Sequence, residues 1–245
     1  MVRALAFDTE SSGPNPRTDR LVTAYLGLVD LSVPPVPYPP GPIREQEWVC
    51  LPEWGFEMPA EAAEVNGYST RRLHLEAEGS TADAVEQIIA IIVGETDPDT
   101  HTEPVPIVAY NAAFDMTLLY HEALRAGIDP SPLERVFVLD PYVMWKRLDP
   151  KRRGGRKLTD AVHAYHLHFP DGAYHTARFD AMAASAVMSK QLRNDLNVGM
   201  PIDVIHEGLR GWYRDQTIEF IRFKRATNPA FTASLDWPIQ KEAVA

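Results

Sequence analysis

The first third of the chain alternates between short apolar runs and turn-forming residues. We expect β-strands at 2–7, 21–29 and 47–51, because apolar runs of this length bounded by Gly, Pro, Asn and Ser are typical of buried strands. The proline-rich stretch 33–42 predicts a stiff, extended connection between two of these strands. Its P-x-x-P spacing would also suit a ligand of a peptide-binding domain, which we consider the weaker interpretation.

Helical periodicity dominates the rest of the chain. The pattern predicts helices at 82–93, 113–127 and about 141–147, 158–167 and 177–197, with short buried strands at 106–111 and 136–140. Three strands followed by alternating helices and strands predict a mixed α/β layer architecture. Residues 212–226 form a further amphipathic pattern and an irregular stretch follows, so we divide the chain into a domain at 1–200 and a C-terminal extension at 201–245.

Composition narrows the class of protein. The 245 residues carry a formal net charge of −10, which argues against a general nucleic-acid binder, since phosphate attracts basic surfaces. The longest clean aliphatic run, 88–93, is too short to span a bilayer, and the N-terminus shows no secretory signal. A single cysteine, Cys50, allows no intrachain disulfide and fits a reducing compartment. We therefore expect a cytoplasmic protein with no membrane partner.

The positive charge is unevenly distributed. Residues 146–157, KRLDPKRRGGRK, hold seven basic residues and one acidic residue, a local charge of +6. Such a run is most often a solvated loop. The alternative is a loop that borders a cleft and follows a phosphate backbone through Arg152, Arg153 and Arg156.

Two carboxylates follow the first predicted strand. Residues i and i+2 of a strand share a face, so Asp8 and Glu10 in FDTE should lie side by side. Two like charges held this close raise a pKa or require a cation between them. Taken alone, the pair indicates either a polar turn or half of a metal site.

Two later stretches favour the metal site. Asp115 in AYNAAFDM follows a short buried strand, and Asp180 in YHTARFDA lies in the first turn of a helix, with His175 five residues earlier. Strand ends and helix starts are where distant segments converge in an open α/β sheet. Hard divalent cations prefer carboxylate oxygen, two of them can support phosphodiester cleavage, and a histidine can take a proton from water near neutral pH. These five residues supply that set.

The three motifs FDTE, NAAFD and HTARFD, in this order, resemble those of the DEDDh 3′–5′ exonucleases. This DnaQ-like family includes the proofreading exonuclease of the bacterial replicative polymerase. The resemblance covers about residues 5–190 and implies an RNase H-like fold with a mixed five-stranded sheet flanked by helices. It also implies that Asp8, Glu10, Asp115 and Asp180 bind two Mg²⁺ or Mn²⁺ ions, with His175 as the general base.

The resemblance also implies residues that contact the substrate. They are Thr9, Ser11, Ser12, Asn66, Asn111 and Phe114. Two positions depart from the family pattern, because its usual histidines are replaced by Asn66 and Tyr110. From the residues alone, Asn111 is more readily explained as a helix cap and Phe114 as a core or wedge residue.

The sequence therefore predicts a metal-dependent 3′–5′ exonuclease that acts on DNA with a free 3′ end, preferably single-stranded, in repair or replication proofreading. A DNA polymerase acting in trans is a candidate partner. Alternatives are a 3′–5′ exoribonuclease on short RNA and a catalytically silent module that binds nucleic acid or a polymerase. The intact acid set argues against a silent module, since a pure binder needs no repelling carboxylates.

Two smaller features stay open. The histidines of HAYHLHF, 163–169, raise the possibility of a zinc site, but only His163 and His166 have helical i, i+3 spacing and no cysteine is near. The helix predicted at 212–226 interleaves aromatic and basic residues, so it either stacks on single-stranded nucleic acid or, as we favour, packs on the domain through one face.

Overall fold

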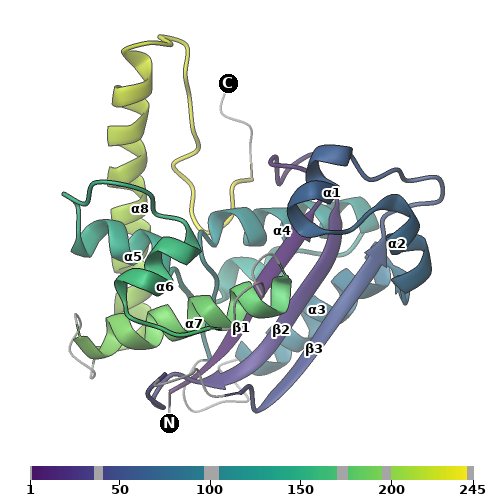
Figure 1. Ribbon diagram of the computed structural model, residues 1–245, viewed down its shortest axis with the longest axis horizontal. Coiled ribbons are helices and arrows are strands. Elements are labelled where there is room, and N and C mark those ends of the chain that lie inside the picture. The colour runs from purple at the N-terminus through teal and green to yellow at the C-terminus, as the bar shows by residue number, and fades with distance from the viewer. Residues whose placement is uncertain (1, 36–40, 97–104, 170–175, 195–199, 242–245) are drawn as a thin grey trace.

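The computed structural model of the protein describes residues 2–35, 41–96, 105–169, 176–194 and 200–241. Its strands form one sheet in the order β4-β3-β2-β1-β5-β6. Figure 1 shows this sheet crossing the middle of the molecule, with helices on both faces and a long helix standing at one side.

The sheet is mixed, as expected. β1 (Arg3–Ser11), β2 (Leu21–Asp30) and β3 (Arg44–Leu51) run antiparallel in succession. β5 (Ile107–Val108) lies parallel to β1 on its other side, and β6 (Val138–Leu139) lies parallel to β5. These strands confirm the predicted architecture of five strands.

A sixth, two-residue strand and two short helices are additions that the apolar pattern does not predict. β4 (Gly79–Ser80) pairs with the end of β3. α1 (Ala60–Asn66) lies beyond the end of β1, and α2 (Thr70–Glu76) lies against the end of β3. Each buries a single side chain, Asn66 and Leu73. Because these helices have so little apolar periodicity, their sequence does not distinguish them from a loop.

Helices cover both faces of the sheet. α7 (Ala177–Asn194) crosses one face against β1 and β2, while α3 (Thr81–Thr96) and α4 (Ala113–Ala126) cover the other (Figure 1). α5 (Pro141–Leu148) and α6 (Leu158–Ala164) pack against α7 at the side of the sheet. A 3₁₀ helix, η1 (Ser131–Arg135), precedes β6.

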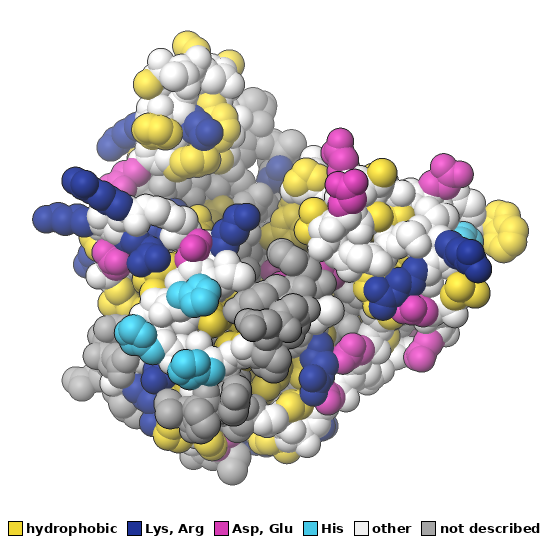
Figure 2. All heavy atoms as spheres, in the orientation of Figure 1, with side chains coloured by type: hydrophobic (Ala, Val, Ile, Leu, Met, Phe, Trp, Pro, Cys, Tyr) yellow, Lys and Arg dark blue, Asp and Glu magenta, His cyan; other side chains and the backbone are white. Residues whose placement is uncertain are grey.

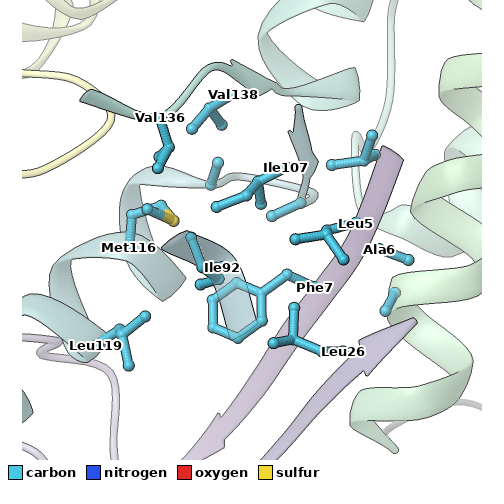
Figure 3. Packing of buried hydrophobic residues seen from close by; sticks show 14 of the residues in the cluster. Leu5, Ala6, Phe7, Leu26, Ile92, Ile107, Met116, Leu119, Val136 and Val138 are labelled. Atoms are coloured by element: carbon cyan, nitrogen blue, oxygen red, sulfur yellow. The ribbon is translucent and has the colours of Figure 1, made fainter. Parts of the chain in front are cut away.

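The main core lies between the sheet and the pair α3 and α4. Figure 3 shows Leu5 and Phe7 of β1 pointing toward Ile92 and Met116, while Ala6 points the other way, toward α7. All five side chains are fully or almost fully buried. The alternation of β1 thus assigns its large residues to one helical layer and its small residues to the other.

The C-terminal extension contains the long helix α8 (Ile202–Arg225). Its first half packs on α5 and β6, and Ile205 and Leu209 join the main core together with Trp237 and Ile239. The second half rises beyond the rest of the body, and the following segment returns alongside it (Figure 1). The helix starts ten residues earlier than the pattern at 212–226 predicts. The division of the chain at residue 200 stays a prediction.

In the part of the chain that the structure describes, no helix combines the length and apolar character that crossing a membrane requires.

Candidate active site

Three carboxylates meet between β1 and α7. Asp8 and Glu10 both lie within β1, which extends to Ser11 rather than ending at Phe7 as the apolar run predicts. Asp180 lies in the first turn of α7. One ligand oxygen from each lies within 4.8 Å of the other two, and all three residues are partly exposed. We refer to Asp8, Glu10 and Asp180 as the acid cluster.

Small side chains bring the two elements close enough for this contact. The β1 face that carries Asp8 and Glu10 also carries Ala4 and Ala6, because side chains alternate along a strand. The facing positions of α7 include Ala181 and Ala184, and these alanines are completely buried. Alanine on both sides lets the helix axis approach the sheet, so Asp180 reaches the end of β1.

Burial and neighbouring acids both act on the two β1 carboxylates of the acid cluster. Burial raises the pKa of Asp8 well above its usual value, and the neighbouring Asp115, Asp180 and Glu10 raise it further. Burial, then Asp180 and Asp115, raise the pKa of Glu10 to about 8. At neutral pH the folded protein therefore holds protons on these groups or needs a bound cation.

Asp115 approaches from the opposite side of β1. It lies in the first turn of α4, only 3% exposed, and accepts hydrogen bonds from the backbone N–H of Thr9 at 3.0 Å and from its Oγ1 at 2.6 Å. Burial raises the pKa of Asp115 to about 7, while the bonds from Thr9 act to lower it. Asp115 is thus anchored next to the acid cluster without being one of its three mutually close members.

This donor set fits divalent cations. Mg²⁺ and Mn²⁺ prefer oxygen ligands, and several carboxylates at one place allow one of them to bridge two ions about 3.5–4 Å apart. The mutual repulsion that raises these pKa values would be relieved by a cation. Asp8, Glu10 and Asp180 would hold it, with Asp115 beside them.

The predicted general base lies outside the described residues. His175 belongs to the segment 170–175, and the described chain resumes at Thr176, four residues before Asp180. The assignment of His175 stays a prediction.

Four of the predicted substrate contacts bond to the protein itself. Thr9 binds Asp115 as described, and Ser11 donates to the carbonyl of Gly13 at 2.7 Å. Ser12 is buried, and its Oγ accepts from the N–H of Arg20 at 2.8 Å. Asn66 is also buried. Its Nδ2 donates to the Ser11 carbonyl at 3.1 Å and its Oδ1 accepts from the N–H of Tyr68, which ties the α1 segment to the end of β1.

The other two predicted substrate contacts, Phe114 and Asn111, are at least partly exposed to solvent. The side chain of Phe114 is partly exposed and packs against the edge of the main core. Asn111 is exposed, with a left-handed φ of 62°. The interpretation of Asn111 as the helix cap is wrong, because the N-cap residue of α4 is Ala112 and no side-chain cap bond forms there.

Asp140, which the sequence interpretation missed, binds the backbone directly before α4, where a bond from the Asn111 side chain was expected. This fully buried carboxylate accepts from the N–H groups of Asn111 at 3.0 Å and Ala112 at 2.9 Å, and also caps α5 through the N–H groups of Tyr142 and Val143. Burial raises its pKa to about 6, against the effect of these four bonds. The signal was an Asp after a buried strand and directly before Pro141, a combination typical of a helix start.

The zinc interpretation finds no support among the described residues. His163, His166 and His168 are all exposed, and within that part of the chain the acid cluster is the one group of three potential ligands close enough to share an ion.

Comparisons with known proteins bear on the fold. No family model and no curated protein sequence matches the chain. Solved structures of exonuclease I do match in three dimensions. An E. coli exonuclease I complex with a dT13 oligonucleotide has a TM-score of 0.62 and 17% identity, over 79% of this chain and 41% of that one.

Two further structures agree. The zinc-bound form of an E. coli exonuclease I complex with single-stranded DNA gives a TM-score of 0.65 and 16% identity, over 90% of this chain and 46% of that one. Exonuclease I from Methylocaldum szegediense gives 0.63 and 18%, over 91% and 46%. The chain spans less than half the length of these proteins. The likeness confirms the fold that the motifs implied: this chain has the fold of the corresponding part of exonuclease I.

Proposed function

We propose that the protein is a metal-dependent 3′–5′ exonuclease that removes nucleoside monophosphates from DNA, preferably from single-stranded 3′ ends. The observation that carries the proposal is the acid cluster, in which ligand oxygens of Asp8, Glu10 and Asp180 lie within 4.8 Å of one another. The likeness of the fold to exonuclease I, solved with oligonucleotides bound, supports it.

The residues divide the chemistry between them. Asp8, Glu10 and Asp180 would hold the divalent cations, two in number in this proposal, and Asp115, fixed by Thr9, would complete the set from the α4 side. Bound Mg²⁺ or Mn²⁺ would supply charge stabilisation for the attacking and leaving oxygens of an in-line displacement. His175 takes the proton of the attacking water as that water forms its bond to the terminal phosphorus. The bond to the 3′ oxygen of the preceding nucleotide breaks, which releases a nucleoside 5′-monophosphate and leaves a new 3′ hydroxyl.

The test is hydrolysis of 5′-labelled single-stranded DNA with Mg²⁺, with Mn²⁺ and with a chelator. We expect progressive shortening from the 3′ end that the chelator abolishes, slower cleavage of a 3′-phosphorylated strand and survival of a circular strand. Rapid cutting of the circle would indicate an endonuclease on the same fold. A parallel RNA strand measures the preference for sugar, because two-metal hydrolysis does not require or exclude a 2′-hydroxyl.

The same proposal places the protein in the cytoplasm, in DNA repair or replication proofreading, with a DNA polymerase as candidate partner in trans. The support is chemical: polymerases generate the mismatched, frayed 3′ ends that such an enzyme would remove. Excision of a 3′-mismatched primer, measured with and without an added replicative polymerase, tests the partnership. An unchanged rate would contradict it.

A further inference from the structure

Two basic segments that are far apart in sequence meet at one side of the molecule. One is the loop between α5 and α6, residues 149–157, which we call the basic loop. The other is the outer part of α8 with the segment that returns beside it, residues 218–236, which we call the arm. Figure 1 shows the arm standing above the loop, and Figure 2 shows Lys and Arg side chains gathered at the left, where the loop lies.

The basic loop is fixed to the segment that leads into the active site. The hydroxyl of Tyr110 donates to the carbonyl of Arg156 at 2.8 Å, and Tyr110 directly precedes the turn at Asn111 from which α4 and Asp115 begin. The guanidinium groups of Arg152 and Arg156 lie over the ring of Trp145, at 4.5 and 5.3 Å from its centroid. These arginines therefore hold the loop in place.

The remaining basic residues of the loop face solvent. Lys151 and Arg153 are exposed, and Gly154 with a φ of 108° makes the turn between them and Arg156. This division changes the sequence-based expectation that Arg152, Arg153 and Arg156 act alike, because only Arg153 of the three is exposed. Phosphate contacts would come from Lys151 and Arg153.

The arm carries exposed aromatic rings among basic residues. The last buried side chain of α8 is Thr217, so the helix beyond it contributes nothing to the core. There Phe220 is 45% exposed and Phe223 is 74% exposed. Lys224 lies over the ring of Phe220, at 5.4 Å from its centroid, and Arg222 is exposed beside Phe223. The expectation that this helix packs on the domain along one face holds only for its inner half.

Contacts between α5 and the part of α8 that precedes the arm keep the two segments on the same side of the molecule. Nε2 of Gln216 in α8 donates to the carbonyl of Val143 in α5 at 3.0 Å, and the guanidinium of Arg147 lies 5.8 Å from the centroid of the Trp212 ring. The basic loop begins directly after α5. One face of a chain with a net charge of −10 thus concentrates both cations and exposed rings.

We propose that the basic loop and the arm together form a binding surface for single-stranded nucleic acid on the 5′ side of the reacting end. Lys151, Arg153 and Arg222 would contact phosphates, and Phe220 and Phe223 would stack on bases. Aromatic rings among cations are the combination that binds single strands without reading sequence. This inference rests on the proposed function, which places the 3′ end at the acid cluster.

The test compares two double variants with a control that removes as many positive charges as the loop variant. K151A/R153A alters the loop and R222A/F223A alters the arm, and the structure gives these four side chains no role in holding the fold. The control R3A/K190A removes two positive charges at the other ends of β1 and α7. Arg3 lies five residues from Asp8, about 17 Å along a strand. Lys190 lies ten residues from Asp180, about 15 Å along a helix.

KM and kcat are measured on labelled single strands of about four and about 24 nucleotides, since single-strand sites span roughly 4–16 nucleotides per domain. We expect KM for the long strand to rise about 5- to 100-fold in R222A/F223A, the range of one lost stacking contact. In K151A/R153A the log–log salt slope of binding should fall by up to about 1.4, at roughly 0.7 per phosphate of a single strand. The short strand and the control should change by less than about twofold.

Three outcomes would overturn the proposal. One is an unchanged KM and salt slope for the long strand in both variants. Another is an equal change in the control or on the short strand. The last is a concentration-dependent dimer of the wild type that R222A/F223A abolishes, which would make the arm a contact between copies. If the wild type hydrolyses no strand, the proposed function fails, and equilibrium binding of the labelled long strand to the same variants in chelator still tests the surface.

Discussion

Asp140 and the acid cluster are both carboxylate sites with raised pKa values, and their surroundings are opposite. Asp140 is fully buried with four backbone N–H groups directed at it. Asp8, Glu10 and Asp180 are partly exposed and have one another as near neighbours. Yet burial raises the pKa of Asp140, to about 6, as it raises that of Glu10, to about 8.

The difference shows that a raised pKa does not by itself identify a functional acid. Asp140 has donors that use its lone pairs, so it fixes the starts of α4 and α5 and has no free oxygen to offer a ligand. The acid cluster gains its pKa shifts partly from like charges, so its oxygens suit a cation. Asp115 is intermediate, since Thr9 occupies one of its oxygens.

The largest effect should come from removing a member of the acid cluster. Asp8→Ala or Asp180→Ala should abolish nearly all hydrolysis at saturating Mg²⁺, a loss well beyond the about 10- to 100-fold typical of residues that only support metal ligands. Circular dichroism should show an unchanged fold. Near-wild-type activity of either variant would refute the metal assignment.

His175→Ala should come next. A general base contributes about 10²–10⁴-fold to rate without binding the metal. The variant should therefore lose kcat by that factor, keep its metal affinity, and show a flattened or displaced acidic limb of the pH–rate profile near pH 6.5. Measuring kcat against pH and Mg²⁺ together separates this from a packing role, in which stability falls while kcat and its profile stay.

Asp140→Asn tests the other side of the comparison. The amide keeps one acceptor oxygen and turns an NH₂ group toward backbone N–H donors. If the NH₂ group takes the place of Oδ2, the N–H of Ala112 loses its partner, and in the opposite orientation the other three N–H groups lose theirs. We expect a loss of about 2–4 kcal/mol in the free energy of unfolding, measured with urea. The matched change Asp83→Asn, at an exposed carboxylate near the start of α3 that accepts from the N–H and Oγ of Ser80, should cost less than about 1 kcal/mol. Equal losses in the two variants would contradict the assigned role of Asp140.

Glu10→Gln should stabilise the metal-free protein. The pKa of Glu10 is about 8 when folded against 4.5 for the free side chain, so the folded state binds more protons in between. Stability of the wild type in chelator should therefore fall as pH rises from about 4.5 to 8. At pH 8 the variant should be more stable by on the order of 1 kcal/mol or more, since one pKa unit corresponds to about 1.36 kcal/mol.

Two controls accompany that measurement. Glu86→Gln, an exposed acid on α3, should leave the pH dependence unchanged. Saturating Mg²⁺ should remove most of the advantage of Glu10→Gln. If the stability of the wild type in chelator did not change over this pH range, the pKa of Glu10 would not be raised in the folded protein.

The sequence by itself determined most of the elements and which carboxylates form the candidate site. Apolar runs and periodicity predicted the main strands and helices, because an element that buries one face has apolar residues at a regular spacing. The period of two put Asp8 and Glu10 on one face of β1, and the motifs marked Asp115 and Asp180. The position of a residue can be predicted without the tertiary structure when it bonds only to neighbours close in sequence or follows a strict period.

Only the tertiary structure decided which side chains are used by the protein itself. The amide of Asn66, a predicted substrate contact, donates to the carbonyl of Ser11, 55 positions away. Asp140 reaches back 28 and 29 positions to cap the segment before α4. The placement of the basic loop and the arm on one side of the molecule depends on packing between α5 and α8. Such contacts form because the packing of helices on the sheet brings residues together that are far apart in sequence. A local pattern of polarity or charge does not predict them.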